Sequence, residues 1–142
     1  FFSPQSVEEW RQHAKLGSVL AKPILTQLGH SKEFINQVCY LIEHHDHRTL
    51  EEKTFELKIL QDADLIADWG LAGFIRPILY GSKFKRSVYS TITHIQKKIN
   101  TVDNRYKLLN LRISKKLGQD EINLQNKLYC ELIDDSKSDL LK

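Results

Sequence analysis

The sequence has no methionine and only two cysteines among its 142 residues. Because even the first position lacks a methionine, we expect the sequence to be part of a longer protein. Cys39 and Cys130 lie far apart among apolar neighbours, with no spacing typical of a metal-ligand pair. This favours two small buried or half-buried side chains over a disulfide or a reactive thiol. Such cysteine usage makes a cytoplasmic location the expectation.

Several sequence signals are also missing. No run of about 18 apolar residues is present, so we expect no membrane-spanning helix. The first four residues lack the basic and apolar regions of a signal peptide. There is no phosphate-cradling glycine-rich loop, no Cys-x-x-Cys, no Gly-x-Ser-x-Gly and no carboxylate pair that suggests a glycosidase. The sequence therefore offers no evidence for those enzyme classes.

The composition is that of a globular domain, with 41% hydrophobic and 27% charged residues. The net charge of +3 is unevenly spread, because ten lysines and arginines but only one acid, Asp103, lie between Lys83 and Lys116. Such a stretch can hold an anion such as a nucleotide or nucleic acid. A solvated helix face is the favoured alternative.

Apolar residues recur at helical spacing along most of the chain, and no segment alternates as a strand would. We therefore expect an all-α domain of about five to seven helices over residues 1–142, with a frayed tail from 134. The expected helices run from about 7 to 28 with a kink or break at Pro23, 32–45, 51–69, 71–80, 83–99 and 103–133 with a break at Gly118.

The chemistry-bearing residues are histidines and aspartates. His44 and His45 are adjacent on a helix, about 100° apart, so they could address two neighbouring metal ions or one metal and one phosphate. Asp62 and Asp64 are about 200° apart and cannot face the same site on a regular helix. One should be a ligand, and the other a supporting group, a cap or a solvent-facing side chain.

Ion pairs are the alternative to a metal for these carboxylates, with partners such as Lys58, Arg48 and Arg76. Carboxylates in an apolar helical pattern are costly unless paired, and a metal is an efficient partner. Taken singly, the other histidines favour ordinary core or surface roles. These are His13, His30, His47 and His94.

The order of several short motifs resembles the second half of the HD-domain superfamily, and most closely its small stand-alone bacterial phosphohydrolases. These motifs are His13-Ala-Lys-Leu-Gly-Ser-Val-Leu-Ala, Tyr40-Leu-Ile-Glu-His44-His45, Lys58-Ile-Leu-Gln-Asp62-Ala-Asp64, Gly70-Leu-Ala-Gly73-Phe-Ile-Arg76 followed by Tyr80-Gly81, and His94-Ile-Gln-Lys97-Lys98. Each motif is weak alone, and their order and spacing together are moderately specific. The resemblance covers about residues 7 to 133.

The resemblance implies a helical domain that holds one or more divalent metals (Mn, Mg, Fe, Ni or Co) and hydrolyses phosphate esters or anhydrides, frequently in nucleotides. The family's final metal-binding aspartate falls on Asp64. His13 and His44 match histidines that complete a second metal or contact phosphate in some branches, and His45 matches a ligand in the branch with paired histidines. Asp62 would then be a supporting residue and Arg76 structural or phosphate-facing.

Two departures from the family pattern stand out. The family's first metal-binding histidine and its His-Asp pair have no counterpart before His13, and Leu65 replaces the arginine that usually follows the metal aspartate. Either N-terminal helices are missing from this sequence or the protein has diverged and lost a complete metal site.

Three functions follow as hypotheses. The first is a metal-dependent phosphohydrolase acting on a small phosphorylated substrate such as a nucleotide. The second is a catalytically degenerate HD-like module that binds a nucleotide or, less favoured, a nucleic acid through the basic 83–116 helices. The third is a scaffold or homo-oligomer contact through the long C-terminal helix.

Overall fold

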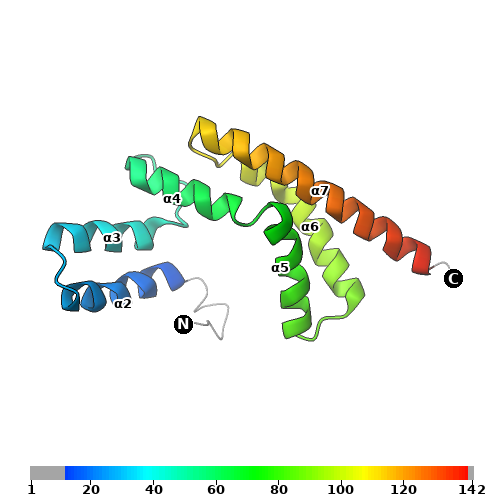
Figure 1. The fold of residues 1–142 in the computed structure, drawn as a ribbon, viewed down its shortest axis with the longest axis horizontal. Coiled ribbons are helices and arrows are strands. Elements are labelled where there is room, and N and C mark those ends of the chain that lie inside the picture. The colour runs from blue at the N-terminus through cyan, green and yellow to red at the C-terminus, as the bar shows by residue number, and fades with distance from the viewer. Residues whose placement is uncertain (1–11, 141–142) are drawn as a thin grey trace. The chain divides into compact units, whose positions relative to one another are not determined.

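The structure, a computed structural model, describes residues 12–140, and for 136–140 the backbone only. This part of the chain is all-helical, as the sequence predicts, and contains no strand (Figure 1). None of its helices is both long and apolar enough to cross a bilayer. The helices are α2 (His13–Gln27), α3 (Lys32–His44), α4 (Phe55–Ile66), α5 (Gly70–Lys83), α6 (Val88–Tyr106) and α7 (Arg112–Leu140).

The chain forms two compact units, which divide within α4 after Gln61. In the first unit, α2 and α3 pack against each other as a helical hairpin (Figure 1). Gly29 ends α2 with a φ of 78°, a conformation that glycine adopts without steric cost. Ser31 then begins α3, because its hydroxyl accepts a hydrogen bond from the Phe34 amide. The predicted cap and bounds of α3 are confirmed.

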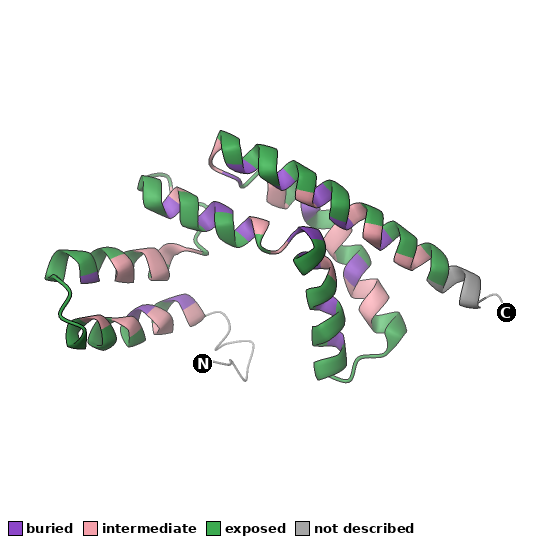
Figure 2. Ribbon diagram, in the orientation of Figure 1, coloured by how far each residue is buried: buried purple, intermediate pink, exposed green. Residues whose placement is uncertain are grey.

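In the second unit, α5, α6 and α7 pack against one another. Buried positions recur every three or four residues along α7, which gives it one inward face (Figure 2). A β-carbon at Gly118 would lie 2.7 Å from the Trp69 ring, so this glycine lets α7 approach the indole closely. The apolar core consists of Leu65, Trp69, Val102, Leu109 and Ile122.

Several helix bounds differ from those predicted. The break expected between 99 and 103 is wrong, because α6 continues to Tyr106 and buries Val102 in the core. The break expected at Gly118 is also wrong, because α7 is continuous there. The backbone of α7 remains helical to Leu140, beyond the predicted fraying at 134. Similarly, α5 runs to Lys83, past its expected end at Tyr80.

Two further expectations are corrected. Pro23 lies inside α2 without dividing it. Cys130 is exposed, because it falls on the outer side of α7. Cys39 is half-buried, as expected, and its thiol donates a hydrogen bond to the Ser18 carbonyl. The expected helix start near residue 7 lies outside the described residues.

Candidate functional site

The first unit brings two of the predicted ligands together. His13 lies at the start of α2, and His45 is the C-cap of α3, so the antiparallel hairpin places them side by side. Their Nε2 atoms are 3.1 Å apart, and their rings meet edge to face with centroids 5.0 Å apart. Both side chains are partly buried. The two imidazoles therefore face each other at hydrogen-bond distance, through a ring nitrogen that can also bind metal ions.

The His45 ring is oriented by its own helix. Its Nδ1 lies 2.7 Å from the Ile42 carbonyl oxygen, which can only accept a hydrogen bond. Nδ1 therefore carries the proton, and in the neutral ring Nε2 presents a lone pair toward His13. A histidine whose second nitrogen is held by a backbone carbonyl is the usual arrangement around a bound metal.

Gln61 holds the turn that follows α3. This side chain is fully buried, and its amide nitrogen donates to the carbonyl oxygens of both His44 and His47, each at 3.0 Å. Arg48 in turn donates to the Gln61 carbonyl. The turn after His45 is therefore fixed by buried hydrogen bonds. One sequence signal for this role is the glutamine at a core-facing position of the 58–64 motif.

The spacing of the two histidines fits one divalent metal ion. Two nitrogen ligands about 2.1 Å from an ion lie about 3.0 Å apart at right angles and about 3.4 Å apart at the tetrahedral angle. The observed 3.1 Å falls within this range. Among the described residues, however, no three His, Cys, Asp or Glu side chains form a group that could hold a metal. The residues present thus fit two coordination positions rather than a complete set.

His44, another predicted ligand of the first unit, has other neighbours. The His44 ring contacts the rings of Tyr40 and His47, with centroids 4.6 and 6.3 Å away. Asp64 is exposed on the part of α4 that belongs to the second unit. Within the first unit, the two predicted ligands that the structure brings into contact are His13 and His45.

Asp62 serves as a cap, one of the roles that its position on the helix left open. Its carboxylate is 1% exposed and accepts three hydrogen bonds at the start of α7. The backbone amide and side-chain amide of Asn110 donate to Oδ1 at 2.7 and 2.8 Å, and the amide of Leu111 donates to Oδ2 at 2.8 Å. The side chain of Leu111 cannot accept a hydrogen bond from the backbone amides at this helix terminus. Asp62 on α4 provides the acceptor instead.

Arg76 is part of a cluster around Asp68. Both Arg76 and Arg105 form ion pairs with this carboxylate, the latter at 2.9 Å. Burial opposes ionisation of Asp68, but the Arg105 hydrogen bond and the charges of Lys98, Arg105 and Arg76 outweigh it and lower its pKa. The pKa of Lys98 is also lowered, by burial and by the two arginines against the attraction of Asp68. Three cations thus share one acid.

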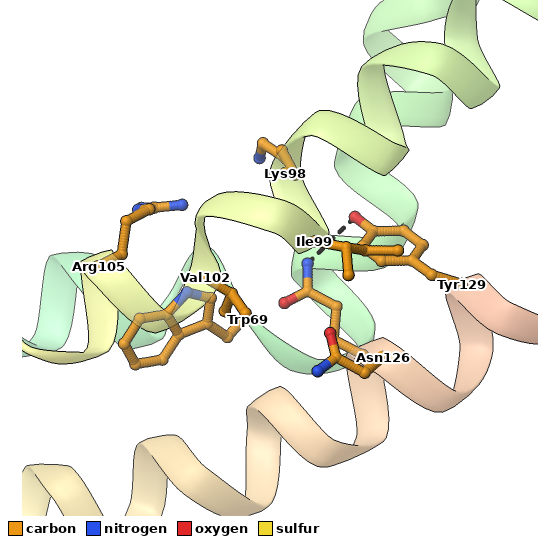
Figure 3. A pocket seen from close by; sticks show the side chains of 8 residues that line it. Trp69, Lys98, Ile99, Val102, Arg105, Asn126 and Tyr129 are labelled. Carbon is orange, nitrogen blue, oxygen red and sulfur yellow. Dashed lines mark hydrogen bonds between the residues drawn. The ribbon is translucent and has the colours of Figure 1, made fainter.

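A small cavity of about 10 Å³ adjoins this cluster (Figure 3). Its walls include Trp69 at the turn before α5, Lys98 and Arg105 on α6, and Asn126 and Tyr129 on α7. The Trp69 indole nitrogen is buried, and no hydrogen-bond partner reaches it from the described residues. Leaving such a donor unsatisfied costs about 1–3 kcal/mol. The sequence offered no signal that these side chains meet.

A second, open hollow of about 440 Å³ lies along one face of α6. Its cationic side chains are Arg86 and Lys97, with His94 between them. Burial and then the charges of Arg86, Lys98 and Lys97 lower the pKa of His94. The remaining lining residues, Tyr89, Ser90 and Thr93, carry hydroxyl groups. None of the described residues that line this hollow is acidic.

Comparisons with known proteins give a similarity of fold. No family model matches the chain, and no curated protein matches it. A crystal structure of a protein from Lactobacillus plantarum, a structural genomics target, superposes with a TM-score of 0.55 at 14% sequence identity. The match covers 90% of this chain and 87% of that one. The chain is therefore similar in fold to that protein.

Proposed function

We propose that the protein is a metal-dependent phosphohydrolase in which His13 and His45 bind one divalent cation. The observation that carries this proposal is the 3.1 Å approach of their Nε2 atoms, with His45 oriented by the Ile42 carbonyl. The resemblance to HD-type phosphohydrolases supports it, because the same residues match histidines of that family. By the same resemblance, Asp64 matches the family's final metal-binding aspartate.

The substrate class we propose is a phosphate ester or anhydride, such as a nucleotide, in a cytoplasmic setting. A bound divalent metal would activate a water molecule and offset negative charge on the phosphoryl oxygens. The protein's own contribution is orientation. The carbonyl of Ile42 fixes which nitrogen of His45 is available, and Gln61 holds the turn that follows it.

The test is metal content by elemental analysis after incubation with Mn, Mg, Co or Ni. We expect bound metal in the wild type and at least a tenfold weaker affinity in His13→Ala and His45→Ala. His30→Ala is the matched control, because His30 is an exposed histidine of the same unit that stacks on Phe34. Equal metal binding by all three variants would refute the histidine pair.

Activity is measured separately as phosphate release from a panel of nucleotides and monoesters. We expect release that requires added metal and is lost in Asp64→Ala. Metal binding without turnover of any phosphate compound would retain the metal site and refute the hydrolase.

The hollow on α6 favours a second candidate, a module that binds nucleotide or nucleic acid without metal. Arg86 and Lys97 would contact phosphates there. If they do, Arg86→Gln and Lys97→Gln should each weaken binding and reduce the dependence of log affinity on log salt by about one. Absence of binding to RNA, DNA and nucleotides at low salt would refute this candidate.

A further inference from the structure

A small cavity lies beside Trp69 in the second unit. The cavity has room for about one water-sized group. Every charged side chain on its wall is a cation, namely Lys98 and Arg105. The buried indole N–H of Trp69 is a third donor, and it has no partner among the described residues. The lining is therefore suited to an acceptor that carries negative charge.

The charge around the cavity is incompletely balanced. Arg105 is paired with Asp68, but the same carboxylate also pairs with Arg76 and attracts Lys98. Three positive charges therefore face one negative charge in a half-buried setting, where charges are screened less than at the surface. An added anion would reduce the repulsion among these cations.

We propose that this cavity is an anion subsite for a phosphoryl group, with one oxygen accepting the Trp69 indole hydrogen bond. The other oxygens would face the ammonium of Lys98 and the guanidinium of Arg105, which are common phosphate-binding groups. The small volume admits a single oxygen, so the rest of the group lies at the open side of the cavity. Figure 3 shows the side chains that line the cavity, which come from α6, α7 and the turn before α5.

This proposal does not depend on the histidine pair. It needs no metal, and all its residues belong to the second unit. A protein that bound no metal would still be expected to bind phosphate here.

The test is a titration of the full chain with inorganic phosphate, followed through the Trp69 indole N–H resonance. The sequence has two tryptophans, so Trp10→Phe leaves Trp69 as the single reporter. Chloride replaces phosphate in a parallel titration that keeps the ionic strength constant. We expect a saturable shift with phosphate and none with chloride.

Two variants probe the cations. Lys98→Gln should weaken phosphate binding at least tenfold, and this variant should fold because it removes one of three crowded cations. Arg105→Lys keeps the charge but loses the planar fork, so we expect a weaker effect. Lys116→Gln is the control, since Lys116 is exposed on α7 and lies outside both the cavity wall and the hollow on α6.

Three results would overturn the proposal. These are an indole resonance that does not move, a shift that is linear or identical with chloride, and equal phosphate affinity in the Lys98→Gln and Lys116→Gln variants. Each would mean that the cavity holds a water molecule and that the cations serve only to pair with Asp68.

Discussion

Replacing Asp62 with asparagine should destabilise the second unit without removing any apolar contact. The carboxylate accepts hydrogen bonds from two donors of Asn110 and from the Leu111 amide. An asparagine keeps one oxygen for Asn110 but turns an NH₂ group toward Leu111. The variant therefore loses one hydrogen bond to a charged group, about 1.5–3 kcal/mol. It also loses the negative charge at the start of α7, about 0.3–1 kcal/mol.

These losses predict a free energy of unfolding lower by about 2–4 kcal/mol. Asp62→Ala, which removes all three hydrogen bonds, should cost more. The assay is urea unfolding followed by the fluorescence of Trp69 in a Trp10→Phe background, because Trp69 lies in the core of this unit. With a slope of about 1–3 kcal/mol per molar urea, the midpoint should fall by about 0.7–4 M.

The matched control is Asp120→Asn, an exposed aspartate on α7, which should change stability by less than about 0.5 kcal/mol. If Asp62→Asn were as stable as this control, the capping role of Asp62 would be wrong. A loss of bound metal at unchanged stability would instead place Asp62 at a metal site.

Two further predictions concern the same unit. Gly118→Ala should lower the free energy of unfolding by about 1–2 kcal/mol. The new β-carbon would lie 2.7 Å from the Trp69 ring, and the cost of this overpacking exceeds the gain in helix propensity. An unchanged urea midpoint would contradict this prediction. The pKa of Asp68 is lowered on folding, chiefly by the Arg105 hydrogen bond acting against burial, from the usual 3.8. Its contribution to stability is therefore complete above about pH 4 and is lost as the pH falls through the lowered pKa. In the Asp68→Asn variant, the free energy of unfolding should therefore fall less steeply as the pH is lowered. If its dependence on pH matched that of the wild type, the ion pairs of Asp68 would be refuted.

The sequence alone determined the fold class and much of the local structure. Helical periodicity predicted an all-α chain, and Ser31 and Gly29 marked helix ends because capping and positive φ depend on neighbouring residues only. The 200° separation of Asp62 and Asp64 likewise predicted that they would differ in environment, since it follows from helix geometry. The structure buries the first and exposes the second.

Tertiary structure decided the contacts between residues distant in the chain. Periodicity could not predict that α6 passes through Asn100 and Thr101, because the burial of Val102 against other helices overrides weak local preference. It could not assign the partner of Asp62 either, because Asn110 and Leu111 reach it only after α4 and α7 have packed. The pairing of His13 with His45, and the cavity beside Trp69, arise in the same way. Helix periodicity fixes which face a residue occupies, whereas only packing fixes what that face meets.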